Sequence, residues 1–152
     1  MKNNKDKDKD IVTFKSILNI IKLRSTCSRI QVGTLLILDG RIISMGWNGV
    51  PPKHKHCNLN SWDFNKESDV EKHRIFSDEN ELHSECNALM FAAKHGIKTD
   101  NSDLYVNISP CTSCAKLIIA AGIKNVYYEI EYDRSTKGIK LLKESGVKIY
   151  KI

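Results

Sequence analysis

The sequence is poor in several features that would indicate particular classes of protein. Only 7% of its 152 residues are aromatic and only three are proline, and it contains no apolar run long enough to cross a bilayer. It also lacks a basic leader followed by an apolar stretch and a cleavage site, which argues against secretion. No basic stretch is interleaved with aromatics, as in grooves that stack single-stranded nucleic acid. We therefore expect a soluble, cytoplasmic protein.

Length and composition fit one globular domain. Hydrophobic residues make up 41% of the chain, enough to form a core, and the net charge is +6. We expect residues 1–10 to be a disordered charged tail, because they carry no apolar pattern, and residues 11–152 to form a single domain. The basic balance suits a phosphorylated substrate or nucleic acid, although the lysines are scattered. Five cysteines mixed with histidines are typical of metal chemistry in a reducing compartment.

Apolar periodicity predicts alternating strands and helices. Strands are expected at 31–38 and 41–47, joined by a hairpin turn at Asp39-Gly40, whereas the stretch from 48 to 82 has no regular pattern. The alternation of the second half predicts a sheet layered between helices. The remaining expected elements are a helix at 14–21, helices that begin at the two clusters described next, strands at 104–108, 125–130 and 147–150, and a helix at 135–145.

Two clusters of metal-ligating residues each stand at the start of a helical pattern. Apolar residues recur at i, i+3, i+4 and i+7 between His83 and Gly96, and the same spacing follows Cys111 and Cys114 up to Gly122. Free backbone N–H groups and the helix dipole favour thiolate at a helix start, and thiolate is the form that binds zinc. One imidazole and two thiolates would leave a fourth zinc position open for water and chemistry.

The residues around His83 allow two interpretations of this cluster. Glu85 lies beside His83 in the first turn and need not be a ligand, which suits a carboxylate that moves protons near bound water. Alternatively, Cys86 is three residues after His83 and could complete a closed structural tetrahedron with Cys111 and Cys114. In that case Glu85 is only a solvated acid near a helix N-terminus.

The same residues carry a resemblance to a known family. The pattern H-x-E followed by P-C-x-x-C is that of zinc nucleobase deaminases. Further runs resemble deoxycytidylate (dCMP) deaminases and cover roughly residues 12–135 in order, including RSTCSR at 24–29, GWNGVP at 46–51 and SPCTSCAK at 109–116. The resemblance implies an α/β fold of three layers, α/β/α, with a mixed five-stranded sheet. It also implies zinc-dependent conversion of dCMP and water to dUMP and ammonia, with Glu85 as the proton shuttle.

The resemblance further implies a second zinc site. Residues Cys27, Cys57, His73 and Glu81 match positions where some members of the dCMP branch bind a structural zinc. Four such ligands would close a tetrahedron and hold the long irregular stretch between 48 and 82 against the domain. The alternative is that Cys27 is an ordinary buried thiol and that His73 is solvated.

Substrate contacts come from the resemblance as well. Asn48 matches a family position that touches the sugar, and Tyr132 matches one near the base, although a turn residue and a buried strand-end tyrosine would look the same. Lys53 stands where the family commonly has glycine, and this departure argues against copying the family's phosphate contact to this loop. The cationic loop can still offer Lys53 or Lys55 to the phosphate. A solvated charge cluster is the alternative for the two lysines.

The resemblance also implies how such a protein is assembled and controlled. The family is often hexameric, and often activated by dCTP and inhibited by dTTP.

Two other functions stay open from the sequence. One is deamination of another cytosine compound, or of adenosine in transfer RNA, since the zinc chemistry is shared. The other is a non-catalytic, zinc-stabilised interaction module that tolerates replacement of Glu85.

Overall fold

A five-stranded sheet forms the middle layer of the protein. The computed structural model describes residues 4–132 and 135–152, and the strand order is β2-β1-β3-β4-β5. Strand β1 (Gly33–Leu38) pairs antiparallel with β2 (Arg41–Trp47) and with β3 (Asp103–Ile108). Strand β4 (Asn125–Ile130) pairs parallel with β3 and with β5 (Lys148–Lys151). The mixed five-stranded sheet expected from the resemblance is confirmed.

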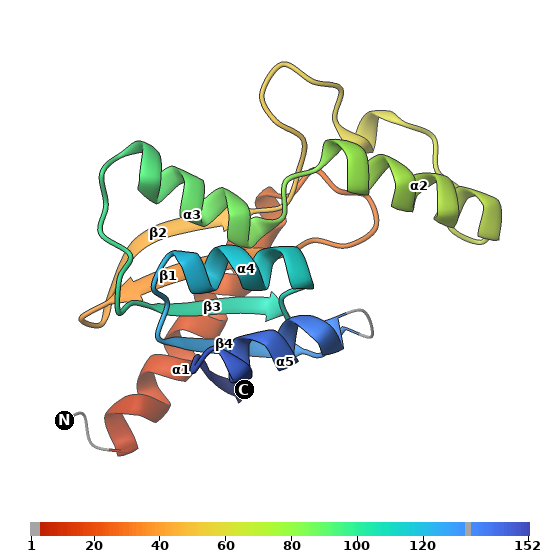
Figure 1. Cartoon of the computed structure of the whole chain (residues 1–152). Helices are drawn as coiled ribbons and strands as arrows, with labels where there is room; N and C mark the ends of the chain where they lie inside the picture. The colour runs from red at the N-terminus through yellow and green to blue at the C-terminus, as the bar shows by residue number, and fades with distance from the viewer. Residues whose placement is uncertain (1–3, 133–134) are drawn as a thin grey trace.

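Helices cover both faces of this sheet (Figure 1). Helix α1 (Asn4–Ile21) packs on one face against β1 and β3. The opposite face carries α3 (Ser84–Lys94), α4 (Thr112–Ala120) and α5 (Thr136–Glu144). Helix α2 (Glu67–Asn80) projects from one end of the layers, and two short 3-10 helices are η1 (Lys22–Arg24) and η2 (Cys57–Leu59). No helix within the described ranges is both long and apolar enough to cross a membrane.

Alternation along the strands divides the core in two. Leu36 and Val106 point to the α3, α4 and α5 side, whereas their neighbours Leu35 and Tyr105 point to α1, where Phe14 packs against Tyr105. Successive side chains of a strand point to opposite faces of the sheet. All four of these residues are buried, so both faces of the sheet are covered. The two apolar layers fix the positions at which α3 and α4 begin, and the candidate site lies there.

Turn chemistry confirms the hairpin expected between the first two strands. Asp39 and Gly40 have φ values of 52° and 76°. Two consecutive residues with positive φ match the twist of the flanking strands, and aspartate followed by glycine is a favoured pair for such turns. The other expected strands and helices of the sheet layers are also present, with boundaries within a few residues.

Two expectations about the first 82 residues need correction. Helix α1 begins at Asn4, so residues 4–10 are helical rather than disordered, whereas residues 1–3 of the expected tail lie outside the described residues. Once the apolar part of α1 packs on the sheet, each further turn adds hydrogen bonds without a new nucleation cost. Helix α2 lies in the stretch that carried no regular pattern, because His73 is its only buried residue.

Candidate metal centres and active site

The starts of α3 and α4 bring three metal-ligating side chains together. His83 is the N-cap residue of α3, Cys111 is that of α4, and Cys114 lies in the first turn of α4. The Nδ1 atom of His83 is 3.5 Å from Sγ of Cys111 and 3.4 Å from Sγ of Cys114. All three ligand atoms lie within 4.8 Å of one another, so one ion can reach them all. We call this group the first triad.

Electrostatics within the first triad favour a thiolate. A hydrogen bond from Cys114 lowers the pKa of Cys111 to about 3, and a hydrogen bond with Cys111 raises the pKa of His83 to about 9. The bond with Cys111 and burial raise the pKa of Cys114. Cys111 is therefore the anionic partner to which the other two groups donate. Because zinc binds the deprotonated thiol, the group is already partly prepared for a metal.

Glu85 and Cys86 lie differently with respect to the first triad. Glu85 is 4% exposed, and burial raises the pKa of its carboxyl group. Its Oε2 atom accepts a hydrogen bond of 3.1 Å from the hydroxyl of Ser84. Cys86 is not part of the group of ligand atoms within 4.8 Å. The donors present are thus two thiols and one imidazole, which is a set of three rather than a closed four-ligand set.

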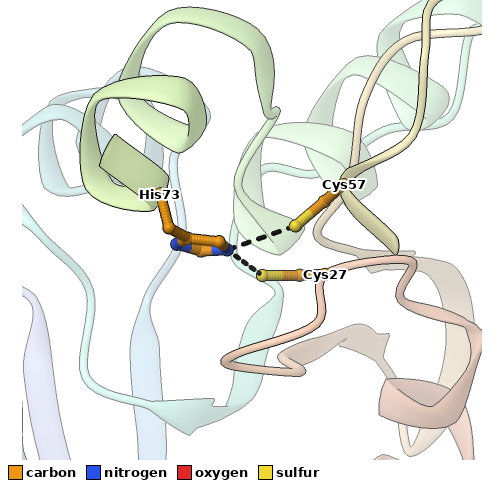
Figure 2. Close-up of side chains that lie close together, drawn as sticks. All are labelled: Cys27, Cys57 and His73. Carbon is orange, nitrogen blue, oxygen red and sulfur yellow. Dashed lines mark hydrogen bonds between the residues drawn. The ribbon is translucent and has the colours of Figure 1, made fainter. Parts of the chain in front are cut away.

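A second group of the same ligand types joins Cys27 to the segment 49–82, which carries α2 and which we call the excursion (Figure 2). Cys27 comes from the segment between η1 and β1, Cys57 opens η2, and His73 lies on α2. The Nε2 atom of His73 is 3.4 Å from Sγ of Cys27 and 3.2 Å from Sγ of Cys57. All three residues are buried, and all five cysteines of the chain are free thiols. We call this group the second triad.

Aromatic rings enclose the histidine of the second triad. The rings of Trp62 and Phe64 lie edge-on to His73, at 5.3 and 5.2 Å between centroids. The indole Nε1 of Trp62 also donates a hydrogen bond of 3.0 Å to the carbonyl of Cys57. Burial lowers the pKa of His73, which favours the neutral imidazole that metals require, and raises the pKa of Cys27 to about 11. Metal binding here would release the proton of that thiol.

The fourth expected ligand of this site, Glu81, is close but not joined to the second triad. Its carboxylate is not among the ligand atoms within 4.8 Å of one another. Oε2 of Glu81 accepts a hydrogen bond of 2.7 Å from Ser77, while Oε1 is buried with no hydrogen-bond partner among the described residues. A buried carboxylate oxygen without a partner is costly, and a nearby cation would offset that cost.

One cavity of about 440 Å³ connects the two triads. His83 and Cys111 contribute to its wall from the first triad, and Cys27 and His73 contribute from the second. A space of this size is typical of small-molecule sites. Glu85 lines the cavity together with Asn48 and Tyr132, the side chains expected to contact sugar and base. The further polar lining residues relevant here are Arg29, Arg74 and Glu81.

Asn48 is held by backbone on both ends of its amide. Its Oδ1 accepts a hydrogen bond of 2.9 Å from the N–H of Val32, and its Nδ2 donates one of 2.8 Å to the carbonyl of Ile30. An amide nitrogen has two protons, so one N–H remains for a ligand in the cavity. The turn interpretation and the ligand interpretation of Asn48 are therefore compatible.

Lys53 does not line the cavity. It is exposed with φ of 75°, and Lys55 is exposed as well. The cationic side chains that do line the cavity are Arg29 and Arg74, which were not singled out from the sequence. Arg74 is engaged by Glu71 and Asp78 on its own helix, whereas no ion pair of Arg29 is found among the residues that the structure describes. Arg29 is thus a cation of this wall that forms no ion pair with the described residues.

Two glycines allow the helices of the first triad to approach their neighbours. A Cβ atom on Gly46 of β2 would lie 2.3 Å from the carbonyl oxygen of Ser84 and 2.5 Å from the nitrogen of Ala88. A Cβ atom on Gly138 of α5 would lie 2.4 Å from the carbonyl oxygen of Pro110, just before α4. Glycine inside a strand pattern often marks close backbone approach, and that was the signal available at Gly46.

Comparison with known proteins identifies the family to which this geometry belongs. The sequence profile of the Cytidine and deoxycytidylate deaminase zinc-binding region matches residues 7–130. The chain belongs to this family. The zinc-dependent deaminases of the family are hydrolases, and the three-layer cytidine-deaminase-like fold expected from the resemblance is confirmed.

Individual relatives of this deaminase cover most of its length. A deoxycytidylate deaminase of Enterobacteria phage T2 is 29% identical over 92% of this chain and 90% of its own. The ComE operon protein 2 of Bacillus subtilis is 32% identical over 91% of this chain and 69% of its own. A crystal structure of dCMP deaminase from cyanophage S-TIM5, in complex with dCMP and dUMP, matches with a TM-score of 0.75 and 31% identity over the whole of both chains.

Proposed function

We propose that this deaminase converts dCMP and water to dUMP and ammonia. The observation that carries the proposal is the placement of Glu85, buried at the wall of a cavity that His83 and Cys111 also line. Support for the nucleotide comes from the cyanophage enzyme that is similar over its whole length and was crystallised with dCMP and dUMP. As such an enzyme, the chain would supply dUMP for thymidylate synthesis.

The first triad fits a catalytic zinc ion. Two thiols and one imidazole with mutually close ligand atoms are a donor set that zinc favours, and three protein ligands are typical of catalytic rather than structural zinc. His83, Cys111 and Cys114 would hold the ion. When bound, zinc lowers the pKa of water to roughly 7, which supplies a nucleophile near neutral pH.

In this proposal Glu85 moves the protons of the reaction. It takes a proton from the attacking water as the oxygen bonds to C4 of the cytosine, and it delivers that proton to N3. The proton of the new hydroxyl group then passes through Glu85 to the amino nitrogen. The C4–N bond breaks, ammonia leaves, and C4 becomes the carbonyl carbon of uracil. Because burial raises the pKa of Glu85, the carboxyl group is well suited to both taking and giving a proton.

The other cavity residues would position the nucleotide. We assign the remaining N–H of Asn48 to the sugar, and Tyr132 to the side of the base. We assign the phosphate contact to Arg29 instead of Lys53, because Arg29 lines the cavity and Lys53 does not. A guanidinium group can bind phosphate through two parallel hydrogen bonds, and no ion pair with the described residues engages that of Arg29.

We also propose that the second triad holds a structural zinc. Its donors are of the same types as those of the first triad, and the buried, unpaired Oε1 of Glu81 supports the idea of a cation nearby. Glu81 would have to turn toward the thiols to become the fourth ligand. Hexamer formation and control by dCTP and dTTP, both carried over from the family, stay predictions.

Side-by-side measurement of ammonia release tests the proposed reaction. We expect turnover of dCMP to exceed that of cytidine, dCTP and deoxyadenosine nucleotides. Replacement of Glu85 by Gln should lower kcat by about 10²- to 10⁴-fold and leave the bound zinc unchanged, since a proton shuttle of this kind contributes that much. Consumption of another substrate without dCMP turnover would overturn the substrate assignment. A fully active, zinc-loaded Glu85→Gln protein would overturn the role of Glu85 and favour a non-catalytic module.

A further inference from the structure

Two buried hydroxyl groups continue inward from the carboxylate of Glu85. Ser84 is the first residue of α3, and Thr34 lies on β1. Both residues are 0% exposed. Their hydroxyl oxygens are 2.7 Å apart, and the hydroxyl oxygen of Ser84 is 3.1 Å from Oε2 of Glu85. The chain of oxygens therefore runs from the sheet through the helix start to the carboxylate.

The number of protons fixes the direction of these hydrogen bonds. The hydroxyl of Ser84 donates to Oε2 of Glu85, and each hydroxyl has a single proton to donate. Because the proton of Ser84 is used in this bond, Ser84 must accept the proton of Thr34. Consecutive hydrogen bonds in one direction polarise each other, so Thr34 strengthens the bond that Ser84 makes.

The chain of hydroxyls ends inside the protein. Thr34 has no exposed surface, so this path does not lead a proton to solvent. Ser84 bonds only the Oε2 atom of Glu85 and not Oε1, and Glu85 lines the cavity. These features suit an anchor that fixes the orientation of the carboxylate rather than a path that conducts protons.

We propose that Ser84, with Thr34 behind it, is a positioning residue that holds Oε2 of Glu85 and thereby presents Oε1 to the reacting groups. This inference rests on the proposed function, because it assigns Ser84 a role only if Glu85 moves protons. A carboxylate on a short side chain can rotate when one oxygen is released, and proton transfer requires hydrogen-bond reach to both water and base. Removing the hydroxyl of Ser84 should therefore lower the rate of the chemical step and leave nucleotide binding intact.

Because Ser84 is closely packed, the variant that tests its role must carry a side chain no larger than serine. Ser84 is 0% exposed and its hydroxyl contacts that of the equally buried Thr34, so a larger side chain at position 84 would displace its neighbours. Ser84→Ala removes one oxygen and adds no volume. It leaves the hydroxyl of Thr34 without its acceptor, and the double variant Ser84→Ala/Thr34→Val removes that buried group as well. The double variant therefore provides a folded comparison if Ser84→Ala alone is unstable.

The experiment measures kcat, the affinity for dUMP and the zinc content of four proteins: the unmodified enzyme, Ser84→Ala, Thr34→Val and the double variant. We expect Ser84→Ala and the double variant to lose about 10- to 100-fold in kcat, the loss typical when a supporting hydrogen bond is removed. Thr34→Val should lose less, because Ser84 still donates to Glu85. The affinity for dUMP and the zinc content should not change.

Two results would overturn the inference. One is an unchanged kcat in both Ser84→Ala and the double variant. The other is a loss of dUMP affinity in parallel with kcat, which would indicate general distortion of the site. Glu85→Gln separates these failures from failure of the proposed function. If Glu85→Gln is inactive and Ser84→Ala is fully active, the proposed reaction stands and only the role of Ser84 is wrong.

Discussion

The two triads contain the same donors, one imidazole and two thiols, but they are built in different ways. The first is assembled from two helix starts on one face of the sheet, and its histidine is exposed. The second joins a loop, a 3-10 helix and α2, and all of its ligands are buried. Figure 2 shows how its three side chains converge from separate segments of the chain.

The neighbours of the two triads differ as much as their exposure. The first triad has the buried carboxylate of Glu85 at the wall of a shared cavity. The second has the rings of Trp62 and Phe64 around His73. Identical ligands can thus serve different ends. An open position with an adjacent acid suits chemistry, whereas an enclosed group that joins distant segments suits stabilisation.

The largest expected effect comes from removing one thiol from each triad. Cys114→Ser should lose one zinc ion and dCMP turnover while the fold is retained. Cys57→Ser should lose one zinc ion and about 4 kcal/mol or more of unfolding free energy, because it opens the contact that holds the excursion between 48 and 82. Metal analysis, denaturant unfolding and limited proteolysis measure these effects.

The unmodified protein is the reference for that pair and should contain about two zinc ions per chain. A count of one zinc after gentle purification would contradict the second site. Equal loss of turnover and of stability in both variants would contradict the division of roles between the triads.

A smaller effect is expected where the first triad depends on close backbone packing. Gly46→Ala would place a Cβ against the backbone of Ser84 and Ala88, so α3 must shift and carry the ligand and the acid at its start with it. We expect a loss of about 1–3 kcal/mol in stability and about 10²-fold in kcat. Unfolding and steady-state kinetics measure both losses.

Met45 offers a matched control for that change. It precedes Gly46 on the same strand, and its side chain is 40% exposed. Met45→Ala should leave stability and kcat nearly unchanged. If both variants behave alike, the close approach of α3 to β2 is not what positions the first triad.

The smallest expected effect connects the two triads. Backbone N–H groups of Arg29 and Ile30 hydrogen-bond to the sulfur of Cys27, so the second triad holds the segment that carries the proposed phosphate ligand. Arg29→Ala should raise KM for dCMP about tenfold, which corresponds to about 1.4 kcal/mol for a lost charge-assisted hydrogen bond, and should leave kcat/KM for deoxycytidine unchanged.

Lys53→Ala is the control for this prediction, because that lysine is exposed outside the cavity. A rise in KM for Lys53→Ala but not for Arg29→Ala would restore the assignment made from the sequence. The folded fraction of Cys57→Ser should also show a raised KM for dCMP. This result would show that the second triad contributes to binding as well as to stability.

The sequence was most informative where function is local. His83, Glu85, Cys111 and Cys114 could be predicted because helix periodicity places each pair in one first turn. The second triad spans Cys27 to His73, and only the resemblance to a family brought its members together. Its helix α2 was missed because a helix held by one buried histidine shows no apolar stripe.

Other parts of the site depend on tertiary contact and were missed for that reason. Ser84 and Thr34 meet across a helix and a strand, and neither residue reveals its partner by spacing. The available signal was a hydroxyl residue at the start of an otherwise apolar strand, from Gly33 to Leu38. Lys53 was chosen because charge in a loop suggested a phosphate contact, but this lysine is not among the residues that line the cavity.

The excursion from 49 to 82, which carries α2, leaves the sheet layers and returns to them at one point. Gly49 and Leu82 form an isolated antiparallel bridge, with hydrogen bonds of 3.1 and 2.9 Å between their backbone groups. The two ends of the excursion are therefore already adjacent, and the entropy of closing a loop grows only slowly with its length. Segments of other lengths could be grafted between these two residues, which makes this bridge a natural point at which to recombine binding specificity while the deaminase body stays the same.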